Sequence, residues 1–156
     1  YSWVLARARF FLSEEFDGNV DFLKDGRLGV PELLNLMIFG IHRKAPSMAE
    51  IFQFNAAAWI GTGAHLVRYE DLAGHVRALD APAAEAYFGG LLGACGIALP
   101  ADWLDRVRIG ADRKQSATAS ENLNRVPVEL PGELPEAQRR LVDYAAPGLR
   151  ALLGYT

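Results

Sequence analysis

The chain has 156 residues and a formal net charge of −3, which suits one globular domain and gives no basic surface for nucleic acid. Its single cysteine, Cys95, excludes an internal disulfide and a cysteine-rich metal site, has apolar neighbours that predict a buried position, and favours a cytoplasmic protein. No apolar run reaches the roughly 18 residues of a membrane span, and Arg7 and Arg9 interrupt the start where a signal peptide would be apolar.

Two helices are predicted in the first third of the chain. Residues 2–15 have a helical pattern, with Arg7 and Arg9 expected on a solvated face. After a turn-rich stretch, residues 31–43 form a helical segment that is apolar nearly all round. We expect this second helix to be buried or to cover a lipophilic partner.

A third helix is predicted from a start signal in the sequence. Ser47 and Glu50 have the spacing of a capping box, in which each side chain bonds the other residue's backbone N–H. The helix that they open is expected to end at Gly61.

The stretch 64–72, Ala-His-Leu-Val-Arg-Tyr-Glu-Asp-Leu, is the strongest strand signal in the chain. Leu66 and Val67 suit a buried sheet, and Asp71 is a good N-cap for the helical sequence that follows. In open α/β sheets, ligands bind beyond the carboxyl ends of strands. The end of this stretch therefore places a cation, an aromatic ring and two carboxylates at a ligand position.

The rest of the chain is predicted to be mainly helical. The expected elements are helices over 72–79, 83–94 and 100–109, an aperiodic region over 110–132, and a last helix from Pro135 that is kinked or split at Pro147 and Gly148. One strand among many helices fits the helical flank of a parallel sheet, and so an α/β fold.

Three segments resemble sulfotransferases that use 3′-phosphoadenosine 5′-phosphosulfate (PAPS). Arg68-Tyr69-Glu70-Asp71-Leu72 resembles the "RYEDL" strand end of that family. The segment Ser116-Ala-Thr-Ala-Ser-Glu-Asn-Leu123 is similar to the bacterial "S-x-T-A-R-E-N-L" loop near the cofactor. The ending, from Leu134-Pro135-Glu136 to Leu152-Leu153-Gly154-Tyr155, looks like the family's last helix and terminal "LGY".

The resemblance implies a P-loop-like α/β fold with a parallel sheet flanked by helices. Residues 1–156 would be the C-terminal portion of a single sulfotransferase-like domain, because the sequence has no Gly-rich phosphate loop. The catalytic base and lysine of the family are then expected upstream of Tyr1, so no catalytic residue is assigned. The resemblance implies PAPS or its product PAP as co-substrate, and no metal.

Tyr69 is the strongest single site residue. A flat aromatic ring at a strand end can stack on adenine, and the family uses this position in that way. The alternative is a core tyrosine whose hydroxyl is satisfied. Arg68 and Glu70 are expected to have structural roles, Arg68 as an ion-pair partner.

The loop over 112–122 has the composition of an anion site. Its charges and hydroxyls come from Arg113, Lys114, Ser116, Thr118 and Ser120. By the resemblance, this loop closes over the 3′-phosphate of the cofactor. Two positions depart from the family pattern, because Ser120 stands where the family has arginine and Ala6 where it has serine. The alternative is an exposed polar loop.

Three functions remain open on the sequence. The first is sulfuryl transfer from PAPS to a hydroxyl or amine of a small-molecule, lipid or carbohydrate acceptor, alongside a missing N-terminal half or other domains. The second is a degenerate, non-catalytic module for packing or partner binding, which Ala6 and Ser120 favour. The third is a helical domain for a lipophilic ligand, based on residues 31–43.

Overall fold

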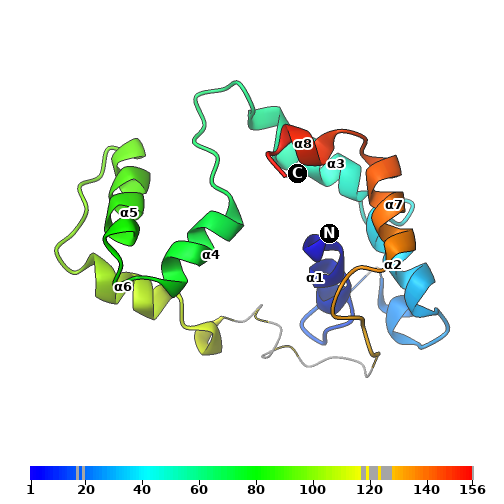
Figure 1. Ribbon diagram of the computed structural model, residues 1–156. Coiled ribbons are helices and arrows are strands. Elements are labelled where there is room, and N and C mark those ends of the chain that lie inside the picture. The colour runs from blue at the N-terminus through cyan, green and yellow to red at the C-terminus, as the bar shows by residue number, and fades with distance from the viewer. Residues whose placement is uncertain (17, 19, 117–118, 120–122, 124–127, 156) are drawn as a thin grey trace. The chain divides into compact units, whose positions relative to one another are not determined.

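The computed structural model describes residues 1–16, 18, 20–116, 119, 123 and 128–155. The regular elements of these residues are helices, arranged in two compact units, Tyr1–Ile60 with Ala117–Thr156, and Gly61–Ser116 (Figure 1). Within the described ranges no strand or sheet forms, and the pairing of Ile41 with Ala45 is an isolated bridge. The predicted P-loop-like α/β fold with a parallel sheet is therefore wrong for this structure.

Residues 64–68 belong to neither a strand nor a helix, and Figure 1 draws them as coil between α3 and α4. Leu66 and Val67 are 51% and 41% exposed. A strand becomes stable only when neighbouring strands bond its backbone and cover one face, and the described residues offer no such neighbour. The next helix begins at Tyr69 with Arg68 as its N-cap, so the prediction of Asp71 as N-cap is also wrong.

The first unit is built around one central helix. Its helices are α1 (Ser2–Phe11), α2 (Val30–Phe39), α3 (Met48–Asn55), α7 (Glu136–Ala145) and α8 (Leu149–Leu152), with short 3-10 turns η1 (Asp21–Lys24) and η2 (Ala57–Trp59). Helix α2 packs against α1, α3 and α7, and it lies beside α7 in Figure 1. Neighbours on several sides explain why α2 is apolar nearly all round, and they confirm the prediction that it is buried.

The ends of these helices follow local signals in the sequence. Helix α2 stops at Gly40, which has φ 81°, earlier than the predicted end at residue 43. The capping box of Ser47 and Glu50 is present at the start of α3. Gly148, at φ 74°, separates α7 from α8, which confirms the predicted split.

Arg7 lies inside the first unit, so the prediction of a solvated face is wrong for this residue. Its side chain is buried beneath the connection from α2 to α3. One guanidinium nitrogen donates to the Met37 carbonyl at 2.9 Å and another to the Pro46 carbonyl at 2.7 Å. The guanidinium also lies over the rings of Trp3 and Phe11, 5.1 Å from each centroid.

The second unit has three helices and a small core. They are α4 (Tyr69–Arg77), α5 (Pro82–Ala94) and α6 (Trp103–Gly110), followed by the 3-10 turn η3 (Arg113–Gln115). Aromatic contacts run from α4 through α5 to α6, since His75 stacks on Tyr87 at 4.2 Å and Phe88 lies 5.5 Å from Trp103. Cys95 is exposed, so the prediction that it is buried is wrong.

No helix formed by the described residues has the length and apolar character needed to cross a membrane.

Candidate functional site

A cavity of about 600 Å³ lies within the second unit, a size typical of small-molecule sites. Helices α4, α5 and α6 and the segment after α6 contribute to its lining. Apolar or small residues form most of the wall, namely Leu72, Ala73, Val76, Phe88, Val107, Gly110 and Ala111. Four residues add polar groups, namely Tyr69, Arg77, Arg113 and Ser116. The cavity therefore joins apolar walls to a few polar donors.

Helix α4 supplies one continuous face of this lining. Tyr69, Ala73 and Arg77 are four residues apart, so they lie above one another along the helix. Leu72 and Val76 have the neighbouring i+3 and i+7 positions on the same face. Because α4 starts at Tyr69, its first turn holds the aromatic ring and its last turn the guanidinium.

Tyr69 is 70% exposed, which rules out the alternative of a core tyrosine. The predicted strand end is the first turn of a helix, yet Tyr69 still lines the cavity. The predicted ion pair of Arg68 is present with Asp71, at a long Nε–Oδ2 distance of 4.0 Å. Tyr69 is thus accessible to a ligand at the start of α4.

The polar loop after α6 contributes two of its predicted residues, Arg113 and Ser116. Asp112 caps the turn η3, since its carboxylate accepts the Lys114 backbone N–H at 3.0 Å and the Gln115 side-chain amide at 3.1 Å. This cap fixes the turn that carries Arg113.

The remaining predicted residues of the loop are not part of this lining. Lys114 is described but does not line the cavity. Thr118 and Ser120 lie outside the described residues.

Arg77 was not predicted as a site residue. Its signal was available, because Arg77 follows Tyr69 by eight residues, a little over two helical turns. The predicted helix began at Leu72, after an expected strand, and a strand places Tyr69 in a different register from Arg77. Once the helix starts at Tyr69, both residues fall on one face.

Two guanidiniums give the cavity a lasting positive charge, because arginine stays protonated over the whole working pH range. Planar guanidinium groups bind phosphate oxygens with two parallel hydrogen bonds. The apolar walls and the Tyr69 ring suit a flat heterocycle. The donor set therefore fits a nucleotide that carries more than one phosphate. No group of three His, Cys, Asp or Glu side chains within the described ranges could hold a metal ion.

Ala6 belongs to the first unit and is exposed on α1. Comparisons with protein-family models, curated proteins and solved structures gave no match for this chain. The resemblance to sulfotransferases therefore stands on the sequence motifs alone.

Proposed function

We propose that the cavity lined by α4 and α6 binds PAPS or PAP, and that the chain takes part in sulfuryl transfer. The observation that carries this proposal is a convergence. Tyr69 and Ser116 come from two separate motifs of one resemblance, more than forty residues apart, and they line the same cavity. Arg113, from the same loop as Ser116, lines it too. Arg77 adds a second guanidinium to that set.

In this proposal, the Tyr69 ring stacks on adenine, and Arg77 and Arg113 neutralise the phosphates. Ser116 donates a further hydrogen bond. During transfer, an acceptor oxygen or nitrogen attacks the sulfur, the bond from sulfur to the 5′-phosphate oxygen breaks, and PAP leaves with that electron pair. The acceptor proton goes to a base that we do not assign. Like phosphoryl transfer, this reaction depends on positioning and on neutralising charge on the leaving group.

The acceptor is a hydroxyl or amine of a small molecule, lipid or carbohydrate, and we place the reaction in the cytoplasm as part of this proposal. A second candidate is a module that has lost catalysis. Ala6 and Ser120 favour it. Compared with the sulfotransferases that the chain resembles, Ala6 lacks a serine hydroxyl and Ser120 lacks an arginine guanidinium.

Calorimetric titration with PAP separates these two functions. We expect wild-type protein to bind PAP more tightly than adenosine 5′-phosphate, which has one phosphate fewer. Replacing Tyr69 with alanine should weaken PAP binding about tenfold, because stacking on a base contributes roughly 1–3 kcal/mol. Arg113→Gln should weaken it by a similar factor of about ten through the lost charge-assisted bonds.

Matched controls come from exposed residues outside the cavity. Tyr144→Ala removes an exposed tyrosine of α7, and Arg106→Gln removes an arginine that pairs with Asp102 at 2.9 Å. Both control variants should bind PAP as wild-type does. Unchanged PAP affinity in both cavity variants would contradict the proposed binding site. If neither wild-type protein nor any variant bound PAP, the non-catalytic module would be the supported function.

A further inference from the structure

The connection between α2 and α3 is a closed, rigid turn. The Ile41 N–H donates to the Ala45 carbonyl at 2.8 Å, and the Ala45 N–H donates back at 2.9 Å. Gly40 precedes this pair at φ 81°, and a Cβ there would lie 2.7 Å from both the Ala45 oxygen and the Ser47 nitrogen. The backbone therefore requires glycine at residue 40, and it holds the turn in one shape.

Arg7 fixes the same turn from the interior of the first unit. Its two donated bonds, to the carbonyls of Met37 and Pro46, reach the chain on both sides of residues 41–45. The Ile41–Ala45 pair and the two Arg7 bonds hold the turn in place. A ligand that binds residues 42–44 therefore loses little affinity to the entropy cost of ordering the turn.

Three consecutive cationic or titratable side chains occupy the tip, and all three are exposed: His42, Arg43 and Lys44. None of them has a carboxylate partner among the described residues. Lys44 Nζ lies 5.0 Å from the centre of the Phe22 ring, which leaves its charge accessible. The tip thus carries two adjacent positive charges, those of Arg43 and Lys44, that form no ion pair within the described residues.

Arg43 is also in an unfavourable backbone conformation. Its φ is 57°, the only positive value among described residues other than glycine. It is the third residue of a turn that the Lys44 N–H closes onto the Ile41 carbonyl at 2.9 Å, a position where glycine is preferred. An exposed arginine with a positive φ and no carboxylate partner among the described residues motivates a functional hypothesis for its guanidinium.

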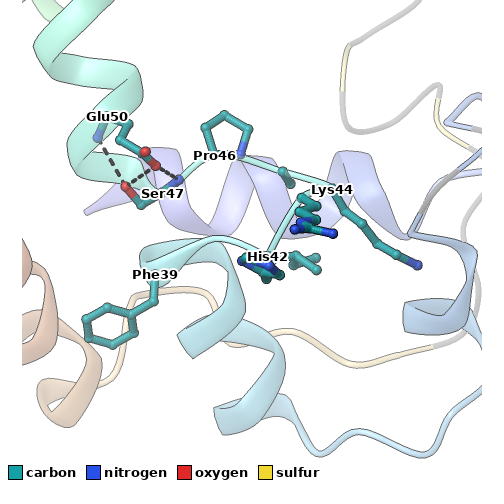
Figure 2. Close-up of a pocket in the computed structure, with 9 residues that line it drawn as sticks. Phe39, His42, Lys44, Pro46, Ser47 and Glu50 are labelled. Atoms are coloured by element: carbon teal, nitrogen blue, oxygen red, sulfur yellow. Dashed lines mark hydrogen bonds between the residues drawn. The ribbon is translucent and has the colours of Figure 1, made fainter.

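A pocket of about 560 Å³ opens at this turn, and Figure 2 shows its lining. At one end, the Glu50 carboxylate accepts bonds from the Ser47 N–H and hydroxyl, both at 2.7 Å. The Lys44 side chain points away from that end. Phe39, Ile41 and Pro46 add apolar surface to the lining. The pocket therefore has a cationic part, apolar contacts, and a carboxylate already bound to the helix start.

We propose that the turn 41–45 binds the phosphate of a phosphate monoester whose organic part is apolar. Arg43 donates two parallel hydrogen bonds to phosphate oxygens, Lys44 adds a second positive charge, and His42 can add a hydrogen bond. The two neighbouring cations, Arg43 and Lys44, match a phosphate dianion better than they match a carboxylate, which carries one charge. Phe39, Ile41 and Pro46 contact the organic part. This site lies in the first unit, whereas the cavity of α4 and α6 lies in the second.

Phenyl phosphate is the probe, followed by two-dimensional ¹⁵N–¹H NMR on the full chain. We expect saturable shifts of the backbone amides of residues 41–47, and weaker binding of inorganic phosphate. Arg43→Gly should weaken phenyl phosphate binding at least about tenfold. It should not unfold the protein, because glycine suits φ 57° better than arginine does.

The matched control is Arg140→Gln, an exposed arginine of α7 in the same unit that pairs with Glu136 at 3.2 Å. This variant should bind phenyl phosphate as wild-type does. Equal affinity of Arg43→Gly and wild-type, or no shifts at residues 41–47, would overturn the proposal. Vesicles of phosphatidylcholine with and without phosphatidic acid identify the source of the monoester. If the protein binds only the vesicles that contain phosphatidic acid, the ligand is a lipid headgroup. If it binds phenyl phosphate but no vesicles, the ligand is a soluble ester.

Discussion

Arg7 shows what a charged residue can do inside a small helical unit. The sequence placed it on an expected solvated face, because arginine is seldom buried and its partners are not visible from sequence. Those partners are backbone carbonyls thirty and thirty-nine residues away. Burial lowers the pKa of the Arg7 guanidinium, but arginine still stays charged at neutral pH. The residue therefore joins α1 to the end of α2 and the start of α3.

Replacing Arg7 with methionine should destabilise the fold by about 2–3 kcal/mol, because the buried Met37 carbonyl and the partly buried Pro46 carbonyl lose charge-assisted donors. The side-chain volume changes little, so packing alone does not explain such a loss. Urea unfolding followed by circular dichroism measures it. Arg9→Met on the same helix is the control and should change the unfolding free energy by less than about 0.5 kcal/mol. Equal losses for both variants would contradict the structural role of Arg7.

Tyr69 is the residue for which sequence reasoning was most useful and still incomplete. The motif around it indicated an accessible ring, and the ring is exposed in the structure. Its neighbours were placed in the wrong element, so Arg77 was missed. A motif identifies candidate site residues, but the start and type of the secondary-structure element decide which of them lie on the same face and line one cavity.

Among the elements, local signals predicted helices well and the strand badly. The capping box of Ser47 and Glu50 and the break at Gly148 are short-range features, and both are present. The expected strand, in the stretch 64–72 and ending in Arg-Tyr-Glu-Asp, depended on partners elsewhere in the chain. Residues 64–68 form coil, and the helix α4 begins at Tyr69. Strand pairing is a property of two segments, and one segment cannot predict it.

The start of α3 gives a pH prediction. Hydrogen bonds from the Ser47 side chain and backbone lower the pKa of Glu50 below its ordinary value of 4.5. Because the folded state favours the ionised carboxyl, this contribution to stability is fully present above pH 4.5 and is lost as the pH falls below it. Wild-type protein should therefore unfold at higher urea than Glu50→Gln at pH 7.

That difference should shrink as the pH is lowered through 4 towards 3. Urea midpoints of both proteins across this range provide the measurement. Glu129→Gln is a suitable control, because Glu129 is exposed in the same unit and lies outside the helices. A Glu50→Gln difference that stays constant with pH would show that the carboxylate does not support the helix start.

For the whole molecule, the sequence correctly predicted a mostly helical chain, but the predicted parallel sheet is absent from the described residues. Composition and periodicity could not show that residues 61–116 form a unit of their own with a small core. That division has a functional consequence, because the proposed nucleotide cavity belongs to one unit and the proposed phosphate turn to the other. Two sites in separate units can be tested separately.

The most direct test of the nucleotide site is an NMR titration of the Arg43→Gly protein with PAP, in which the second phosphate site is removed. We predict saturable shifts for amides of the cavity lining, in particular Ala73, Val76, Val107 and Ala111, with little change in residues 41–47. The same titration of the double variant with Tyr69→Ala should need about ten times more PAP. Absence of shifts along α4 and α6, or identical curves for the two proteins, would contradict the account.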